Sequence, residues 1–152
     1  MSNAVSLTGQ DAITINGRIL ADLADGEVAS LTFPNKLATV KTGKDGNALF
    51  GFNASGQQAE LTLRLMRGGS DDKFLNGLLA NQQLNFAGFT LLAGTMVKKV
   101  GDGAGNIKND TYIVAGGVFD EQVSVKSNVE GDTEQSVSIY KIHFATVSRV
   151  IS

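Results

Sequence analysis

The side chains that could carry chemistry in this chain are few, and the most reactive types are nearly absent. The sequence has no cysteine and a single histidine, His143. Without cysteine there is no disulfide, thiol nucleophile or thiolate metal site, and one imidazole excludes a multi-histidine site within one chain. His143 falls inside a predicted strand and no serine stands in a G-x-S-x-G pattern, so we interpret this histidine as structural rather than catalytic.

Two further segments have some features of binding sites. Asp71-Asp72 could be paired carboxylates or half of a metal site, but their position at the start of a predicted helix favours a simple interaction with the helix dipole. Residues 101–106 have the glycines and oxygen ligands of a Ca²⁺ loop without its spacing or its final glutamate, and we interpret them as a hairpin loop. We therefore expect no catalytic residues, no metal, no cofactor and no enzymatic activity.

Composition and charge exclude several broad classes. The 152 residues suit one domain spanning 1–152, and 42% hydrophobic with 18% charged residues is typical of a globular protein. Thirteen basic and fifteen acidic residues nearly balance, and Lys98-Lys99 is the only adjacent basic pair, so a basic stripe for nucleic acid is absent. A secretory signal and an apolar run of about 18 residues are also absent, so we expect synthesis in the cytoplasm and no membrane contact.

Most of the chain alternates apolar and polar residues in short runs, which is the pattern of antiparallel strands. Asn16-Gly17 predicts a two-residue hairpin, and Glu60–Met66 is the clearest strand. Further strands are expected at 12–15, 18–20, 28–33, 37–41, 48–52, 84–100, 111–119, 122–125 and 137–151, with turns at 24–26 and 130–132. Gly88 and Gly94 suggest bends or bulges. A change of phase near Tyr140 predicts a bulge, or a strand covered on both faces.

One segment has helical spacing instead. Residues 70–81 place apolar side chains on one face, with Ser70 as the expected N-cap. The docking residues of this structural helix are predicted to be Phe74, Leu75, Leu78 and Leu79. The predicted fold is mainly β, a two-sheet antiparallel β-sandwich or small barrel with one short α-helix.

Two features indicate contacts beyond the domain. Pro34 is the only proline, so the nearly uncharged strands 48–52 and 111–119 lack common edge protection and are competent to pair with another copy. The glycine-rich arm 41–56 either folds back on its own domain or packs on a neighbouring subunit. The candidate subunit contacts on this arm are Lys44, Asp45, Asn47, Phe50 and Phe52. The alternation of Phe50, Phe52, Phe86 and Phe89 favours a packing role over base stacking.

The order of these parts resembles the tail tube proteins of contractile-tailed bacteriophages. The stretches ITINGRILADLADGEV and VKTGKDGNALFGFNASGQQAELTLRLMRGGSDDKFLNGLL carry the likeness: a short strand, a hairpin arm, a leucine-alternating strand, a Gly/Ser turn and a short helix. It covers residues 11–80 by pattern and the remainder by architecture alone. The type VI secretion tube protein is similar in architecture.

The resemblance implies a structural protein of the virion tail, assembled in the host cytoplasm. Homohexameric rings would join their inner sheets into one continuous β-barrel and stack into a hollow tube inside the sheath. The implied partners are further copies of the chain and the tail sheath, baseplate and tail terminator proteins, with DNA only as passing cargo.

Because basic walls would bind DNA repeatedly, we expect a neutral to acidic lumen, with candidate acidic residues after Gly101. The alternative is a binding module, monomeric or oligomeric, that recognises a receptor or carbohydrate. The absence of tryptophan and the presence of only two tyrosines weaken the carbohydrate version.

Overall fold

The computed structural model describes residues 6–21, 29–125 and 136–151. These residues form an eight-stranded antiparallel sheet of order β2-β1-β7-β8-β10-β6-β3, with β9 beside β10, and a separate two-stranded sheet. The strands of the large sheet are β1 (Ser6–Ile15), β2 (Arg18–Ile19), β3 (Ala29–Thr32), β6 (Ala59–Met66), β7 (Leu92–Gly101), β8 (Ile107–Phe119), β9 (Ser124–Val125) and β10 (Val137–Ile151). The other elements are β4 (Ala38–Thr42), β5 (Ala48–Phe52), the 3-10 helix η1 (Ala54–Gln57) and the helix α1 (Ser70–Leu84). The predicted mainly-β fold is confirmed.

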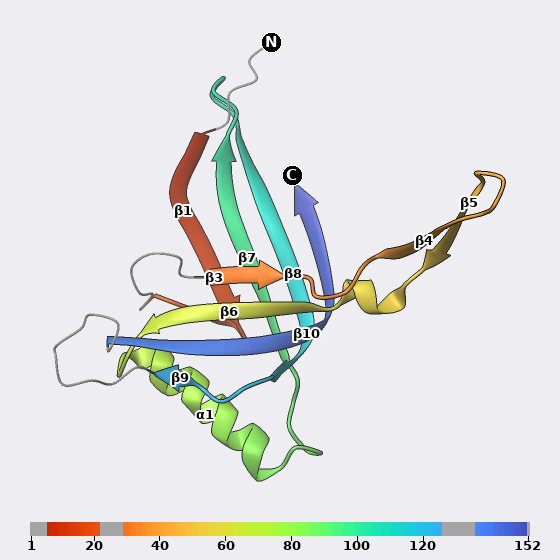
Figure 1. Cartoon of the computed structure of the whole chain (residues 1–152). Helices are drawn as coiled ribbons and strands as arrows, with labels where there is room; N and C mark the ends of the chain where they lie inside the picture. Colours follow the sequence, from red (N-terminus) through yellow and green to blue (C-terminus); the bar gives the residue numbers. More distant parts are fainter. Residues whose placement is uncertain (1–5, 22–28, 126–135, 152) are drawn as a thin grey trace, which may run out of the picture.

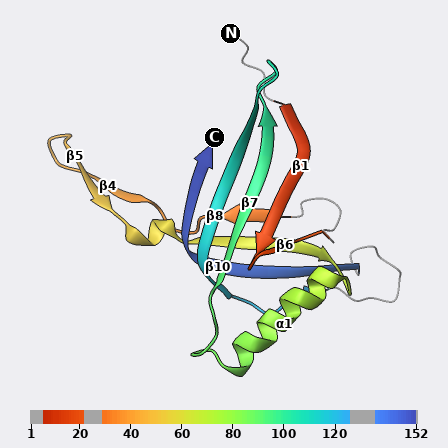
Figure 2. The same cartoon turned by 180° about the vertical axis from the view of Figure 1, so that it is seen from behind.

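The large sheet folds over on itself, so that its strands lie in two layers (Figures 1 and 2). β1, β7, β8 and the C-terminal half of β10 form one layer, and β3, β6 and the N-terminal half of β10 cross them in the other. β10 belongs to both layers, because it pairs with β6 from Val137 to Phe144 and with β8 from Ile142 to Ile151. The result is sandwich-like, with α1 beside the second layer.

The core lies between these elements and is built from alternating apolar side chains. In β6, Leu61, Leu63 and Leu65 are fully buried, as the sequence pattern predicts. They pack in one cluster with residues of every neighbouring element, namely Ile13, Ile15, Leu20, Leu75, Leu79, Leu92, Val114, Phe119, Tyr140, Ile142 and Phe144. One continuous cluster therefore joins the helix to both layers.

The set of alternate side chains that faces the core does change along β10, but farther along the strand than the sequence indicates. From Ser138 to Phe144 its buried side chains have even numbers, whereas farther along Val147 packs on the core. The change lies opposite Gly116. Its φ of +67° is rarely adopted by other residues, and a Cβ at this position would lie too close to Ala145. The bulge predicted near Tyr140 is therefore wrong in position, because Tyr140 lies in regular pairing and is buried.

The helix is longer than predicted and begins differently. It continues past Asn81 to Leu84, and its N-cap is Gly69, which makes no side-chain cap bond, so Ser70 is the first helical residue rather than the cap. Of the four predicted docking residues, Leu75 and Leu79 are buried, whereas Phe74 and Leu78 are partly buried at the margin of the core.

The predicted turns agree with the structure wherever it describes them. Asn16 and Gly17 have φ of +50° and +81°, as a two-residue hairpin requires. The hairpin loop 101–106 is closed by the Asp102 carboxylate, which accepts hydrogen bonds from the Ala104 and Asn106 backbone N–H groups. These bonds and one from the Asn106 side chain, the largest contribution, lower the pKa of Asp102. The turns predicted at 24–26 and 130–132 lie outside the described residues.

Two strand predictions need correction. The expected strand 84–100 begins only at Leu92, because its first residues end α1 and form a loop. Gly94 does lie at a register shift between β7 and β8, where a Cβ would approach the Thr14 carbonyl oxygen to 2.4 Å. The strand 111–119 is the C-terminal part of β8 and pairs with both β7 and β10, so it is not an edge available to another copy.

Candidate functional site

The arm is the most exposed part of the structure. β4 and β5 pair only with each other and project from the end of β6 beyond the two-layered body (Figure 1). Every residue of both strands is exposed. The alternative that the arm 41–56 folds back on its own domain is therefore wrong for its paired strands, whereas its last residues form η1, which contacts β10.

One face of the arm is apolar. Because paired residues of an antiparallel hairpin share a face, the pairs Val40–Phe50 and Ala38–Phe52 place four apolar side chains together. Phe50 is 77% exposed and Phe52 79% exposed, which contradicts a core-packing role for them. Phe86 is exposed as well, whereas Phe89 does pack against the core.

The tip of the arm holds the three polar candidate contacts. The Gly43 N–H donates to the Asn47 carbonyl at 2.6 Å, and Asn47 Nδ2 donates to Asp45 Oδ2 at 3.0 Å. Gly46 has a φ of +88° within this turn. Lys44, Asp45 and Asn47 are thus exposed on a defined turn, and the arm presents one apolar face with a polar end.

The layer built of β1, β7, β8 and the C-terminal half of β10 has two open edges among the described residues. β1 pairs with β7 on one side. On the other side β2 pairs with Thr14 and Ile15, and the Leu20 N–H donates to the Ile13 carbonyl at 2.8 Å, which leaves the N-terminal part of β1 open. From residue 145 onward β10 pairs with β8 on one side, while its pairing with β6 has ended at Phe144. Unpaired backbone N–H and C=O groups at such edges are templates for another strand.

The face of this layer that is turned away from the core carries small and neutral side chains. The register places Thr14, Thr95, Ile113 and Ser148 in one row and Ala12, Val97, Thr111 and Val150 in the next. Lys99 continues this face in the row beyond. Asp110 lies on the opposite face, where Arg149 donates to its two carboxylate oxygens at 2.8 and 2.7 Å and lowers its pKa.

The adjacent carboxylates at the start of α1 hold the helix on the sheet. Asp71 is buried and accepts hydrogen bonds from Arg18 Nε at 2.9 Å and from the Ala21 backbone N–H at 2.6 Å. Asp72 accepts from Ser138 Oγ at 3.0 Å and from the Tyr140 hydroxyl at 2.5 Å. Asp71 and Asp72 do lie in the first turn of α1, where the helix dipole favours negative charge, as predicted. The sequence does not indicate their tertiary hydrogen bonds, because the partners lie some 50 to 70 residues away in the chain.

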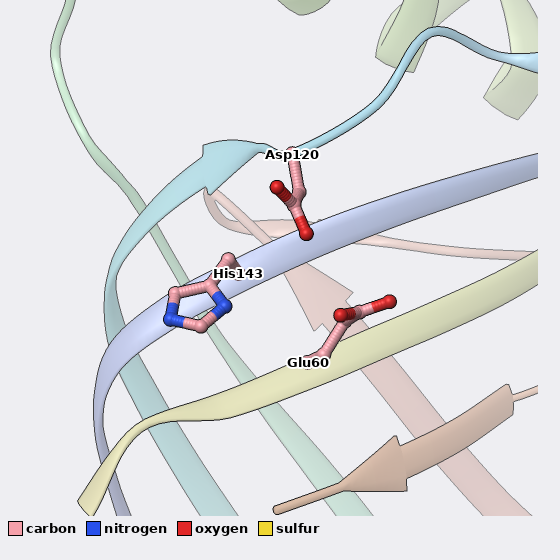
Figure 3. Close-up of side chains that lie close together, drawn as sticks. All are labelled: Glu60, Asp120 and His143. Carbon is pink, nitrogen blue, oxygen red and sulfur yellow. The ribbon is translucent and has the colours of Figure 1, made fainter. Parts of the chain in front are cut away.

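A third group joins one residue each from β6 and β10 and the residue that follows β8. Glu60, Asp120 and His143 bring their potential ligand atoms within 4.8 Å of one another (Figure 3). His143 is in a strand, as predicted, and the ring is half-buried. No ligand spacing along the chain indicates this cluster, because its residues come from β6, the segment just after β8, and β10.

Comparison with known proteins does not assign the chain to a family. No protein-family model matches the chain, and no curated protein matches it. Within the described residues, no helix is long and apolar enough to cross a membrane.

Proposed function

We propose that this chain is a structural tube protein, whose copies join edge to edge into rings that stack into the hollow tube of a contractile phage tail or a related injection system. The observation that carries the proposal is the four-stranded layer with an open edge on each side, β1 and residues 145–151 of β10. The ring size of six is taken from the sequence resemblance.

The strand directions favour a ring. Consecutive strands of the layer β1-β7-β8-β10 are antiparallel, so β1 and β10 run in opposite directions. When two copies stand side by side in the same orientation, β10 of one therefore meets β1 of the next as an antiparallel neighbour. Such a head-to-tail contact uses two different edges, and it closes into a ring when the rotation between copies permits. The strands of all copies would then form one barrel without open edges.

The side-chain chemistry of the layer suits a conduit for DNA. Its open face carries Ala, Val, Ile, Ser and Thr over two complete rows, and we assign it to the lumen. Each phosphate neutralised by a basic side chain adds affinity and salt dependence, so a wall of neutral side chains lets DNA slide. Over these two rows the lumen is neutral rather than acidic, because Asp110 lies on the other face and Asp120 lies beyond the end of β8. Lys99 in the next row is a basic residue on the same face.

The arm supplies the second contact that a tube needs. Phe50 and Phe52 form an apolar face on a hairpin that its own chain leaves exposed. Burial of an exposed phenylalanine contributes about 1.5–3 kcal/mol, so the arm is suited to join a subunit of the same or an adjacent ring.

The rival is a binding module for a receptor or carbohydrate. It would use the exposed arm and leave the two edges of the layer unpaired in solution. Negative-stain microscopy of the purified protein separates the two: rings or tubes support the tube protein, and dispersed particles at high concentration support the module.

Cysteine cross-linking tests the edge contact directly, because the chain has no cysteine of its own. Ala12→Cys on β1 is combined in turn with Thr146→Cys, Ser148→Cys and Val150→Cys on β10, which samples the register between the two edges. A disulfide requires Cα atoms about 4.4–6.8 Å apart, so at least one combination should cross-link on mild oxidation. A head-to-tail ring gives a ladder on non-reducing gels that ends at the ring number.

The single-cysteine variants are the controls. One cysteine per chain cannot produce a ladder, so a dimer from Ser148→Cys alone would indicate symmetric pairing of two β10 edges. Monomers from all three double variants, at concentrations where particles are visible, would refute edge-to-edge assembly.

A further inference from the structure

The cluster of Glu60, Asp120 and His143 combines two carboxylates and an imidazole at the junction of three strands. Glu60 lies directly opposite His143 in the β6–β10 pairing. Asp120 follows the last residue of β8, and its backbone N–H donates to the Lys141 carbonyl at 3.1 Å, which holds it beside β10. The backbone pairing of β6, β10 and β8 thus positions all three ligands.

The imidazole is oriented for ligation. His143 Nε2 lies 3.0 Å from Gln58 Oε1, an oxygen that can only accept, so Nε2 carries the hydrogen. In this tautomer Nδ1 has the free lone pair, and Figure 3 shows one ring nitrogen turned toward the two carboxylates and the other turned away. Metal-bound histidines usually donate their second N–H to such a partner, which fixes the ring and its tautomer.

From this arrangement we propose that Glu60, Asp120 and His143 bind a divalent transition-metal ion, with Zn²⁺ as the ion to test. A ligand set of one nitrogen and two carboxylate oxygens suits Zn²⁺ better than Mg²⁺ or Ca²⁺, which prefer oxygen alone. Water would complete the coordination on the solvent side, where Asp120 is exposed.

The potential ligand atoms lie slightly farther apart in the structure than they would around a bound ion. Metal–ligand distances near 2.1 Å in a tetrahedral site place ligand atoms about 3.4 Å apart, against the 4.8 Å limit within which these atoms lie. Rotation of the Glu60 and Asp120 side chains closes this difference, since Glu60 is only half-buried and Asp120 is exposed. Two carboxylates side by side also repel each other, and a divalent cation removes that repulsion.

The site would have a structural effect. Its ligands come from β6, β10 and the end of β8, and Gln58 lies between η1 and β6, where the arm begins. A bound ion would therefore cross-link both layers of the sheet at the base of the arm. This inference does not rest on the proposed tube, because metal binding is measured on the dissociated chain.

The test is a titration of the full-length, tag-free, EDTA-treated protein with ZnCl₂, followed by calorimetry and thermal unfolding. We expect one ion per chain, and at a hundredfold excess over Kd a rise in Tm of about 5–10 °C. Glu60→Gln, Asp120→Asn and His143→Gln should each weaken binding at least tenfold and remove the rise in Tm. Glu121→Gln, an equal change of charge at the next residue, should change neither.

A second pair of variants tests the orientation of the imidazole. Gln58→Met removes the acceptor for Nε2–H and should weaken zinc binding about 10- to 100-fold, whereas the exposed neighbour Gln57→Met should leave it unchanged. Absence of binding at 100-fold molar excess of zinc would overturn the proposal and leave a charged cluster without an ion. Stoichiometric zinc binding by both single variants, His143→Gln and Asp120→Asn, would also overturn the proposal.

Discussion

The double substitution Phe50→Ser with Phe52→Ser tests whether the arm acts between subunits. Both side chains are more than three-quarters exposed and share the apolar face of a hairpin that no described element covers. Their removal therefore should not destabilise the separate chain, and we expect its free energy of unfolding to change by less than about 0.5 kcal/mol.

The effect on assembly should be large. Burial of a whole phenylalanine side chain contributes about 1.5–3 kcal/mol, and the exposed three-quarters corresponds to about 1–2 kcal/mol for each residue. The two together give about 2–4 kcal/mol per subunit, which weakens the addition of one subunit by about 30- to 1,000-fold.

The assay is sedimentation of assembled material over a range of protein concentrations, together with urea unfolding of the dissociated chain. Leu49→Ser is the matched control, because Leu49 is 68% exposed on the opposite face of the same strand. If the double variant assembles at the wild-type concentration, or if Leu49→Ser weakens assembly equally, the apolar face of the arm is not the contact.

Leu75→Ala should cost about 2–5 kcal/mol in urea unfolding and Leu78→Ala less, because Leu75 is fully buried and Leu78 only partly; equal costs would refute this packing of α1. Gln82→Met should cost about 2–6 kcal/mol, since it leaves the Phe119 N–H and C=O without the amide bonds of 2.8 and 2.9 Å, whereas the exposed Gln83→Met should be neutral. The Arg149 hydrogen bond lowers the pKa of Asp110 from 3.8, so the pair contributes stability above that pH and loses it as the pH falls through the lower folded value. Urea unfolding below pH 4 should accordingly be less pH-dependent for Asp110→Asn than for the wild type. Assembled tubes should not retain duplex DNA at low salt, whereas Thr111→Lys tubes should retain it. For that variant, log K should fall with log salt concentration with a slope of about −0.9 per phosphate contact; tight binding of DNA by the wild type would refute the role as a conduit.

Local pattern in the sequence predicts the strands well, because each depends on residues that are close together in the chain. β5 and β10 have the predicted boundaries, and the leucines of β6 alternate into the core. α1 continues past the predicted end at Asn81, and Gln82 in this added turn is polar yet buried, because its amide bonds the Phe119 backbone as a neighbouring strand would. A residue whose partner lies 37 positions away gives no periodic signal.

Which strands form edges depends on the order of strands in the sheet, and composition gives no information about that order. The uncharged stretch 111–119 of β8 has the composition of an edge strand but lies in the centre of the sheet. Among the described residues, the two open edges of the four-stranded layer belong to β1 and the end of β10, the second of which carries Arg149. The cluster of Glu60, Asp120 and His143 was missed for the same reason, since its geometry exists only once β8, β10 and β6 are side by side.

The open edges and the apolar arm have to be explained together. A chain that acts alone normally protects its edges with proline, charge or bulges. Here the only proline, Pro34, lies before the arm rather than on either edge, and the protection of the two edges consists of Arg149 on β10 and a register shift between Leu7 and Asp11 on β1. A binding module needs one exposed surface, whereas this chain exposes two opposite strand edges and a separate hairpin. Edge-to-edge pairing of β1 with β10 would cover both edges in one step and leave the arm free to reach the next subunit. Since only repeated self-association uses all three surfaces at once, the tube remains the more economical proposal.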